Sequence, residues 1–434
     1  MSAAQTLVSR LEALQCHFTW DLDFSRSLLL RCRDNLIDIG SENGNKWLGH
    51  IYNLRGFIQY KLGSNEDAQS FFNKATEAFS QIKNTDEGPW LVVNYGNLAW
   101  LHHHLGDQVE SEAYLSKVNA LNKKYPSPSQ EELHPEIYAE KAYTLMTFNG
   151  DINLVAVYFQ RAIEMQPDRV EWNSWHVLAL LYASNYSSRS TGLEDDIFQK
   201  MRIAQEQDPE NLYLAAHYLC QRAQRGENVK DEARELATKV LRSPVSSYSG
   251  LKSLLWFYKT YISDDEDIDL AEEALKNHPD ERYLKRRAAL CYEKRILFSK
   301  SPPTKSMIAR AVSLHQEVIA LYPDSSLMRK IHLATIYALS HDEQAKAERI
   351  YQELLKSDLE LAGQQVLFNS YAKYLHFQKQ NEKMSIQYHM KAAKIQHQSF
   401  SRKDSIKVLQ KIRDKGRDRM CGEIRNFLAN LQEP

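Results

Sequence analysis

Apolar residues recur along most of the chain at the spacing of amphipathic helices, and one kind of stop signal ends several of these helices. Each stop places a proline directly before an acidic residue, and a new apolar stretch begins after it. Recurring stops of this kind predict a repeat architecture rather than one globular domain. The four clearest are Gln166-Pro167-Asp168, Asp208-Pro209-Glu210, His278-Pro279-Asp280 and Tyr322-Pro323-Asp324.

Residue sizes between the stops follow the tetratricopeptide pattern. Gly56 and Ala68 are small where two helices of a hairpin would cross, and Phe72 is large where it would pack on the next hairpin. The chain is therefore predicted to be an all-α tetratricopeptide-repeat superhelix, an α-solenoid of paired antiparallel helices without a β-sheet. The matched positions are Tyr52, Gly56, Gly63, Ala68, Phe72 and Ala75, then Tyr95, Ala99, Gly106, Leu115 and Val118, then Gly150, Phe159, Ala162 and Pro167, and in a looser copy Leu333, Ala334, Tyr337, Ala347, Tyr351 and Leu354.

Three parts are expected along the chain. Residues 1–44 form an N-terminal helical segment, residues 45–400 form the tetratricopeptide-repeat superhelix, and residues 401–434 form basic C-terminal helices. Polar stretches rich in serine, proline or glycine predict insertions within the superhelix. These insertions lie near residues 123–135, 185–195 and 299–303.

Composition narrows the class of protein. The net charge of −1 over 434 residues excludes a globally basic nucleic-acid binder, although residues 402–419 hold eight Lys or Arg against three Asp. No apolar run is long enough for a membrane helix, and the N-terminus lacks the apolar core of a signal peptide, so a cytoplasmic protein without membrane contact is expected. Five widely spaced cysteines without a CxxC pair favour neither a disulfide framework nor a zinc site.

Motifs that carry catalysis are missing from the sequence. It contains no glycine-rich phosphate loop, no GxSxG, no HExxH and no paired CxxC. The run His102-His103-His104 is a poor metal site, because consecutive helical residues point about 100° apart. We therefore expect neither an enzyme nor a bound cofactor or metal.

A solenoid offers a concave surface lined by its inner helices, so the question is which ligand that surface accepts. Candidate inner-helix positions are basic or aromatic. Lys252 and Lys259 are two turns apart and share one stripe. Basic side chains interleaved with aromatic rings suit phosphates and stacked bases, whereas the alternative is ordinary solvated charge. The candidates are Tyr143, Tyr182, Lys252, Lys259, Arg286 and Arg287.

A specific motif, Cys16-His17-Phe18-Thr19-Trp20, lies within the stretch LQCHFTWDL, and IYNLRGFIQYKLGSNEDA follows it. With VNYGNLAWLHHHLG and EKAYTLMTFNG further on, the chain resembles the interferon-induced proteins with tetratricopeptide repeats of vertebrates. The resemblance covers most of the chain in the same order. It implies a cytosolic antiviral protein without enzymatic activity. It also implies a basic tunnel that holds the 5′ end of single-stranded RNA, a triphosphate or a cap lacking ribose 2′-O-methylation, without reading sequence.

The resemblance also implies RNA-binding roles for particular residues. Lys46 matches a family lysine near the triphosphate pocket. Tyr143 stands where the family has a tryptophan that stacks on a cap base. Lys252 and Lys259 replace two tunnel arginines and keep the charge but lose bidentate geometry. Arg286 and Arg287 stand where the family has a histidine and a glutamine.

Several positions depart from the family pattern and remove phosphate donors. Asn35 and Ile39 replace a threonine or arginine and a glutamine, Thr147 replaces a lysine, and Tyr182 replaces an arginine. Asn153 replaces a tyrosine. Each lost charge-assisted bond is worth about 1.5–3 kcal/mol. Whether the chain binds a triphosphate, a cap or no RNA end therefore stays open, as do its oligomeric state and its protein partners.

Three functions remain in competition. The first is a cytosolic antiviral effector of innate immunity that binds RNA 5′ ends. The second is a protein-interaction scaffold of the same family that has lost this recognition and binds other family members or host proteins. The third is a co-chaperone that grips acidic tails, but its clamp needs Lys and Asn where the first repeat has Asn53 and Phe57.

Overall fold

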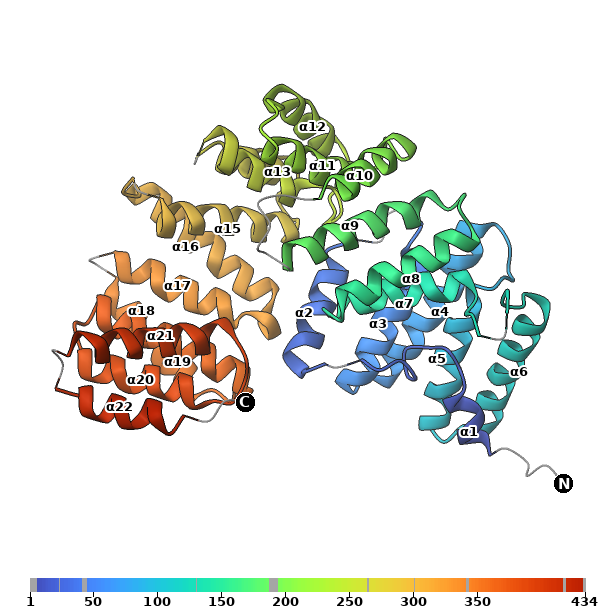
Figure 1. Cartoon of the computed structure of the whole chain (residues 1–434), viewed down its shortest axis with the longest axis horizontal. Helices are drawn as coiled ribbons and strands as arrows, with labels where there is room; N and C mark the ends of the chain where they lie inside the picture. The colour runs from blue at the N-terminus through green and yellow to red at the C-terminus, as the bar shows by residue number, and fades with distance from the viewer. Residues whose placement is uncertain are drawn as a thin grey trace. The chain divides into compact units, whose positions relative to one another are not determined.

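The computed structural model describes residues 6–22, 24–40, 45–129, 131–186, 194–263, 265–299, 301–340, 343–416 and 419–431. Within these ranges the chain forms α-helices joined by short connections, and it forms no β-strand (Figure 1). Helices that follow one another along the chain pack together, which confirms the predicted all-α tetratricopeptide-repeat solenoid. The helices are α1 (Leu7–Glu12), α2 (Arg26–Ile37), α3 (Leu48–Leu62), α4 (Asn65–Lys83), α5 (Leu91–His104), α6 (Gln108–Lys124), α7 (Pro135–Thr147), α8 (Ile152–Met165), α9 (Val170–Tyr186), α10 (Asp195–Gln207), α11 (Leu212–Gln224), α12 (Lys230–Arg242), α13 (Leu251–Phe257), the π-helix η1 (Tyr258–Ile262), α14 (Glu266–Asn277), α15 (Arg282–Phe298), α16 (Lys305–Leu321), the 3-10 turn η2 (Pro323–Ser325), α17 (Leu327–Leu339), α18 (Gln344–Lys356), α19 (Leu361–Phe377), α20 (Glu382–Lys394), α21 (Phe400–Lys415) and α22 (Cys421–Ala429).

Contacts along the chain divide it into two units, residues 1–270 and residues 271–434. The first unit holds α1 to α13, the second holds α15 to α22, and α14 crosses the boundary. The expected three-part division at residues 44 and 400 stays a prediction. Between α6 and α7, and between α15 and α16, the described residues are not helical, at the places where two insertions were expected. Most of the third expected insertion, residues 187–193, lies outside the described residues.

The helix crossing of the first repeat is as tight as the small residues predict. A Cβ atom on Gly56 of α3 would lie 2.7 Å from the ring of Phe72 on α4 and 3.1 Å from the carbonyl oxygen of Ala68. Ala68 and Phe72 are fully buried. Helix α3 then ends at Gly63, whose φ of 93° is the left-handed conformation that glycine adopts without strain. The small and large positions therefore set the distance between α3 and α4.

The CHFTW motif joins the N-terminal segment to α5 and α7. The backbone N–H of His17 donates to Asn97 Oδ1 at 3.1 Å, and Asn97 Nδ2 donates to His17 Nδ1 at 3.0 Å. The other ring nitrogen, Nε2, lies 3.0 Å from Thr144 Oγ1 and carries the proton that this hydroxyl accepts. Burial lowers the pKa of His17 to about 3, against a smaller opposing effect of the Asn97 bond. His17 is therefore a neutral residue that connects the N-terminal segment to α5 and α7.

A ladder of buried polar side chains runs through the first unit. Asn94 Nδ2 donates to Asn53 Oδ1 at 2.7 Å, and Asn53 Nδ2 donates to Glu140 Oε1 at 2.8 Å. All three residues are almost fully buried. Burial raises the pKa of Glu140 well above its usual range, so this carboxyl group tends to stay protonated. Asn53 therefore serves packing between helices and is not presented to a peptide tail.

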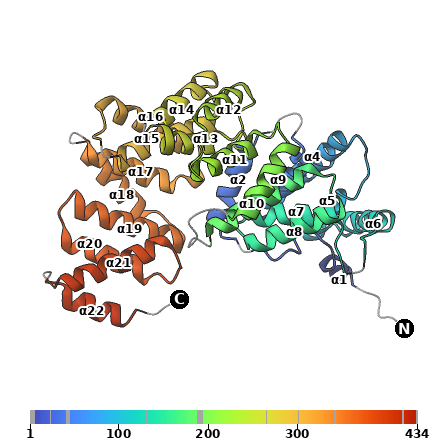
Figure 2. The same ribbon diagram turned by 45° about the horizontal axis from the view of Figure 1, so that its top comes forward.

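In the second unit the looser repeat copy is buried as its pattern predicts. Leu333, Ala334 and Tyr337 on α17 pack with Tyr351 and Leu354 on α18. Figure 2 follows the chain of this unit through α19, α20, α21 and α22. No helix in the described part of the chain is both long enough and apolar enough to span a bilayer.

Candidate nucleic-acid interface

Arginine side chains gather on α15 and α17 of the second unit, where two buried tyrosine rings support them. Arg282 and Arg286 are one turn apart on α15, and their Cζ atoms lie 3.8 Å and 5.1 Å from the ring centroid of Tyr322. Arg287 Cζ lies 5.1 Å from the ring centroid of Tyr283. Because both rings are buried, each guanidinium is held in a defined orientation. We call this set, together with one residue of α17, the arginine wall: Arg282, Arg286, Arg287 and Arg329.

One buried carboxylate, Glu293 of α15, anchors the arginine wall. Arg329 Nη1 donates to Glu293 Oε2 at 2.9 Å, and His332 Nδ1 donates to the same oxygen at 2.8 Å. Burial raises the pKa of Glu293, but the hydrogen bond from His332 and the charge of Arg329 outweigh burial, and the pKa lies below its ordinary value. Glu293 is therefore ionised at neutral pH and fixes Arg329 on the wall.

The positive charges of the arginine wall act on one another. The pKa of Arg329 lies below its ordinary value, mainly because the side chain is buried. The negative charge of Glu293 raises this pKa, whereas the positive charges of Arg286 and Arg287 lower it. His315 Nε2 lies 3.7 Å from Glu293, but burial lowers the pKa of His315 to about 4, so this ring is neutral at pH 7. The arginine wall thus brings four guanidinium groups together on α15 and α17. Clustered positive charge of this kind attracts anions even on a neutral chain.

Tyr143 of the first unit is buried rather than presented on a surface. Its ring lies nearly parallel to that of Trp47, with centroids 5.0 Å apart, and Trp175 packs against its edge at 5.7 Å. Its hydroxyl lies 3.1 Å from the hydroxyl of Tyr248. Only 1% of Tyr143 is exposed. A base can stack on this ring only after a covering side chain such as Trp47 moves, and the contact of Tyr143 with RNA stays a prediction.

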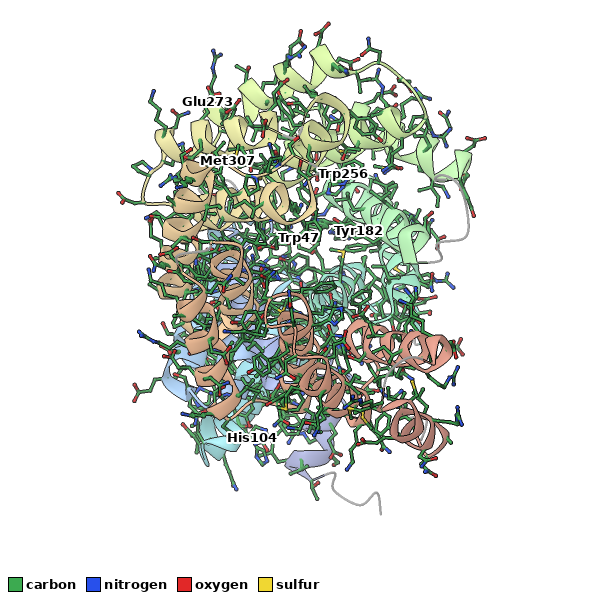
Figure 3. All side chains as sticks on the ribbon, turned by 90° about the vertical axis from the view of Figure 1, so that its left-hand side faces the viewer. Trp47, His104, Tyr182, Trp256, Glu273 and Met307 are labelled. Atoms are coloured by element: carbon green, nitrogen blue, oxygen red, sulfur yellow. The ribbon has the colours of Figure 1, made fainter. Side chains whose placement is uncertain are left out.

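A chain of hydrogen-bonded aromatic residues continues from this cluster toward α13. The hydroxyl of Tyr182 lies 2.9 Å from that of Tyr213 and 3.5 Å from His217 Nε2. The same ring nitrogen lies 3.2 Å from Ser253 Oγ. Burial lowers the pKa of His217 to about 4, and the charge of Lys252 adds to the shift. Trp47 and Tyr182 are labelled in Figure 3.

The three lysines predicted to bind RNA in the first unit are close in sequence to residues of this aromatic cluster, and they differ in exposure. Lys46, directly before the buried Trp47, is exposed, and so is Lys252 in the first turn of α13. Lys259 is half-buried within the π-helical turn that follows α13. Arg286 and Arg287 belong to the second unit, so the predicted cavity shared by all six residues stays a prediction.

The histidine tract and the cysteines show no chemistry of their own. His102 stacks on Tyr114, whereas His104 stacks on Trp100, so these two rings face different partners. No group of three or more potential metal ligands forms among the residues that the structure describes. Four cysteines are buried thiols, and Cys421 is partly exposed.

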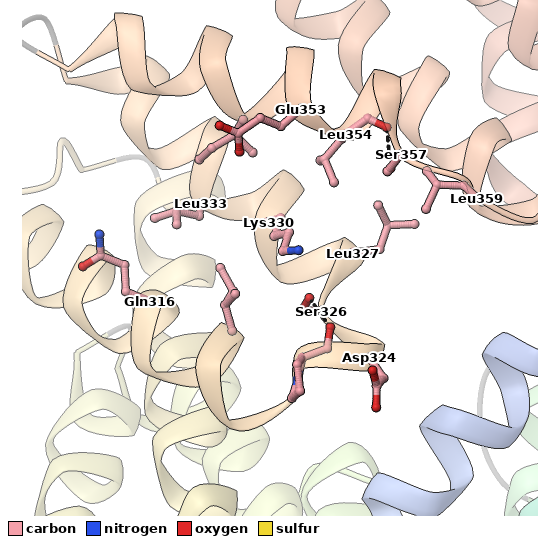
Figure 4. A pocket seen from close by; sticks show the side chains of 13 residues that line it. Gln316, Asp324, Ser326, Leu327, Lys330, Leu333, Glu353, Leu354, Ser357 and Leu359 are labelled. Atoms are coloured by element: carbon pink, nitrogen blue, oxygen red, sulfur yellow. Dashed lines mark hydrogen bonds between the residues drawn. The ribbon is translucent and has the colours of Figure 1, made fainter. Parts of the chain in front are cut away.

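A separate hollow of about 440 Å³ opens among α16, α17, α18 and the connection that follows α18 in the second unit (Figure 4). Its surface is mostly aliphatic, with Leu327, Leu333 and Leu354 pointing into it. Asp324, Lys330 and Glu353 provide charges of both signs. This balance does not favour an anion, so the arginine wall remains the better candidate for phosphate binding.

Known proteins similar to this chain share nearly its whole length. The chain is 25% identical to the human antiviral innate immune response effector IFIT1, over 97% of this chain and 91% of that protein. It is 26% identical to human interferon-induced protein with tetratricopeptide repeats 2, over 99% of this chain and 93% of that protein. The chain is thus similar along nearly its whole length to interferon-induced proteins with tetratricopeptide repeats. No protein-family profile matches it.

Solved structures of this family have the same fold. The human IFIT1 dimer with m7Gppp-AAAA superimposes with a TM-score of 0.68 at 24% identity, over 98% of this chain and 97% of that one. The human IFIT1 dimer with PPP-AAAA gives a TM-score of 0.65 at 23% identity, over 98% and 96%. These complexes describe what the human protein binds.

The positions that depart from the interferon-induced family pattern have mainly structural surroundings. Ile39 is buried, and Thr147 donates its hydroxyl hydrogen to the backbone oxygen of Tyr143 at 2.9 Å. Asn35 and Asn153 are exposed. Tyr182 is half-buried and bonds to Tyr213 as described above. None of these five side chains supplies the positive charge of a lysine or arginine.

Sequence reasoning did not single out Glu293, Arg329, His332 or the supporting Tyr322 as site residues. Arg329 and His332 are three residues apart and therefore share one face of α17. Their spacing on α17 could have indicated that both side chains belong to one site. The position of Glu293 had no such signal, because its partners come from another hairpin.

Proposed function

We propose that this protein is a cytoplasmic antiviral effector of innate immunity that binds the 5′ end of single-stranded RNA without reading its sequence. The bound end is a triphosphate or an incompletely methylated cap, and the protein acts by binding, without catalysis or a cofactor. The observation that carries the proposal is the arginine wall, in which buried tyrosine rings orient Arg282, Arg286 and Arg287 and the buried Glu293 fixes Arg329. The similarity to human IFIT1, which has been solved with PPP-AAAA and m7Gppp-AAAA, supports the choice of ligand.

The chemistry of the arginine wall suits phosphate oxygens. A planar guanidinium presents paired N–H groups that match phosphate in a bidentate manner, and charge-assisted bonds of this kind are worth about 1.5–3 kcal/mol each. The tyrosine rings under Arg282, Arg286 and Arg287 fix these groups before the ligand arrives, which reduces the entropy lost on binding. Phosphate contacts carry no base information, so binding is expected to tolerate any sequence.

Lysines of the first unit are proposed as further RNA-binding residues. Lys46, Lys252 and Lys259 supply compact positive charges that suit a triphosphate but not a bidentate contact. Tyr143 is proposed as the base-stacking residue, which requires its ring to be uncovered on binding. Stacking on one base is expected to contribute about 1–3 kcal/mol.

A second function is supported by a specific observation in the first unit. There the aromatic rings of Tyr143, Trp47 and Trp175 pack on one another, and the positions Asn35, Thr147 and Tyr182 lack the charged donors of the family. These features favour a scaffold that binds other family members or host proteins and has lost recognition of RNA ends.

Charge reversal tests the RNA proposal. Lys259→Glu combined with Arg286→Glu is expected to weaken binding of 5′-triphosphate RNA at least tenfold, and to do so equally for different sequences. Lys305→Glu combined with Lys356→Glu is the matched control, because both lysines are exposed and lie outside the arginine wall. The control is expected to bind like the wild type. Equal affinity of all three proteins, measured by fluorescence anisotropy with circular dichroism to verify folding, would contradict the proposal.

A further inference from the structure

A large groove lies at the C-terminal end of the second unit, among α19, α20, α21 and the turn before α22. Its volume is about 900 Å³, near the upper end of the roughly 300–1,000 Å³ that ligand pockets occupy. Figure 2 shows these helices next to one another, and they are in contact along the chain. We call this feature the C-terminal groove. It shares no residue with the arginine wall.

The three helices turn regular faces toward the C-terminal groove. On α21 the lining residues Val408, Lys411, Ile412 and Lys415 follow the spacing i, i+3, i+4 and i+7, so they form one continuous stripe. Lining residues of α20 and of the end of α19 follow the same kind of spacing. The groove is therefore built by whole helix faces.

The floor of the C-terminal groove is aliphatic, and its edge carries an exposed aromatic ring. Ile386, Val408, Ile412 and Met420 line it, and Ile386 is fully buried. Phe377, in the last turn of α19, also lines the groove and is 70% exposed. An exposed phenylalanine next to an aliphatic floor is a typical anchor point for apolar side chains of a partner.

Positive charge surrounds this apolar floor. Lys383, Lys411, Lys415 and Arg419 line the groove and are exposed, and none of them forms an ion pair with any residue that the structure describes. The two carboxylates in the lining do not balance these charges. Asp404 already accepts a bond from Lys373 Nζ at 2.9 Å, so Glu382 alone faces four cations.

We infer that the C-terminal groove binds a short acidic peptide segment of a partner protein, with carboxylates on its edges and a few apolar side chains on one face. Charge complementarity calls for the carboxylates. The aliphatic floor calls for apolar peptide side chains, since nucleic-acid bases bind by stacking on aromatic rings. The exposed rings of the lining, Phe377 and His376, both lie in the last turn of α19 and do not form the floor. An amphipathic segment laid in a groove between helices is a common mode of peptide recognition.

The acidic helix of the chain itself is not this partner. The segment 265–273 is rich in aspartate and glutamate, but its apolar residues Ile268 and Leu270 are already buried. A second copy would have to unfold α14 to present them. The partner is therefore expected to be a different protein.

Binding of a labelled model peptide tests the inference. The probe is a fluorescein-labelled twelve-residue peptide that alternates pairs of glutamate and leucine, and its control is the same peptide with glutamine in place of glutamate. We expect the full-length chain to bind the glutamate peptide at least tenfold more tightly. Lys411→Glu combined with Lys415→Glu should abolish that preference, and Phe377→Ala should weaken binding about tenfold without loss of folding, because this ring is mostly exposed.

A matched double variant controls for net charge. Lys356→Glu combined with Lys403→Glu changes the charge equally at exposed positions outside the groove and should bind the peptide like the wild type. Equal binding of both peptides, or no effect of the Lys411 and Lys415 change, overturns the inference. The inference is also overturned if 5′-hydroxyl RNA displaces the peptide and its binding requires Lys411 and Lys415. A further contradicting result is a dimer in light scattering that the Lys411 and Lys415 change converts to a monomer. Binding of 5′-triphosphate RNA at the arginine wall should not respond to these groove variants.

Discussion

Replacing Gly56 by alanine tests the helix crossing from which the repeat architecture was predicted. Alanine within a helix is more favourable than glycine by about 1 kcal/mol, so an unhindered change would stabilise the protein. At Gly56 the new Cβ would lie 2.7 Å from the ring of Phe72, which is fully buried and surrounded by other side chains. Overpacking of this kind costs about 1–3 kcal/mol. We therefore expect Gly56→Ala to leave the free energy of unfolding lower by about 1 kcal/mol.

The effect of Gly56→Ala on the free energy of unfolding is expected to change sign when the ring of Phe72 is removed. Phe72→Ala alone should cost about 3–5 kcal/mol, because it leaves a cavity. In that background the contact with the ring is gone and only the 3.1 Å approach to the carbonyl oxygen of Ala68 remains, so Gly56→Ala should stabilise the protein by up to about 1 kcal/mol. Gly49→Ala is the matched control, since its Cβ would lie 2.5 Å from Phe79 and not from Phe72. It should stay destabilising in both backgrounds.

Urea unfolding followed by far-UV circular dichroism measures these differences as shifts of the midpoint at constant slope. The two backgrounds should give opposite signs for Gly56→Ala, which corresponds to a coupling of about 2 kcal/mol between Gly56 and Phe72. Equal effects in both backgrounds would refute the reasoning. So would a wild-type protein that is stabilised by Gly56→Ala.

Two further predictions concern buried titratable groups. His17 has an ordinary pKa of 6.5 and a folded pKa of about 3, so between these values the unfolded chain binds a proton that the folded chain does not bind. The free energy of unfolding should therefore fall as the pH falls from about 6.5 toward 3. Over this range the urea midpoint of His17→Gln should fall less steeply than that of the wild type. Glu140 shows the opposite case, because burial raises its pKa well above 4.5 and the folded state keeps a proton that the unfolded state releases. The advantage of Glu140→Gln over the wild type should therefore grow as the pH rises above about 4.5, and a constant difference between pH 4.5 and pH 8 would contradict this.

The repeat fold was predictable because its signals are local. Gly56, Ala68 and Phe72 lie within two adjacent helices, and the size of each reports on a contact with a neighbour in sequence. The prolines at 167, 209, 279 and 323 likewise report on helix ends. In a solenoid most contacts join neighbouring helices, so local signals suffice for the architecture.

The candidate site was less predictable because its key contacts are not local. Trp47, directly before α3, covers Tyr143 although the two residues are far apart in the sequence, and no spacing rule indicates that contact. Glu293 bonds to Arg329 and His332 across two hairpins. The charges at Arg286 and Arg287 were visible in the sequence, but the tyrosine rings that orient them were not.

Salt dependence of RNA binding tests the central claim most directly. Two RNA oligonucleotides of one sequence, one with a 5′-triphosphate and one with a 5′-hydroxyl, are titrated with the full chain at several salt concentrations. The proposed function predicts tighter binding of the triphosphate RNA, and an affinity that falls with salt with a logarithmic slope of roughly −0.7 for each phosphate contacted. Equal affinities for the two RNAs with little dependence on salt would contradict the proposal and favour the scaffold.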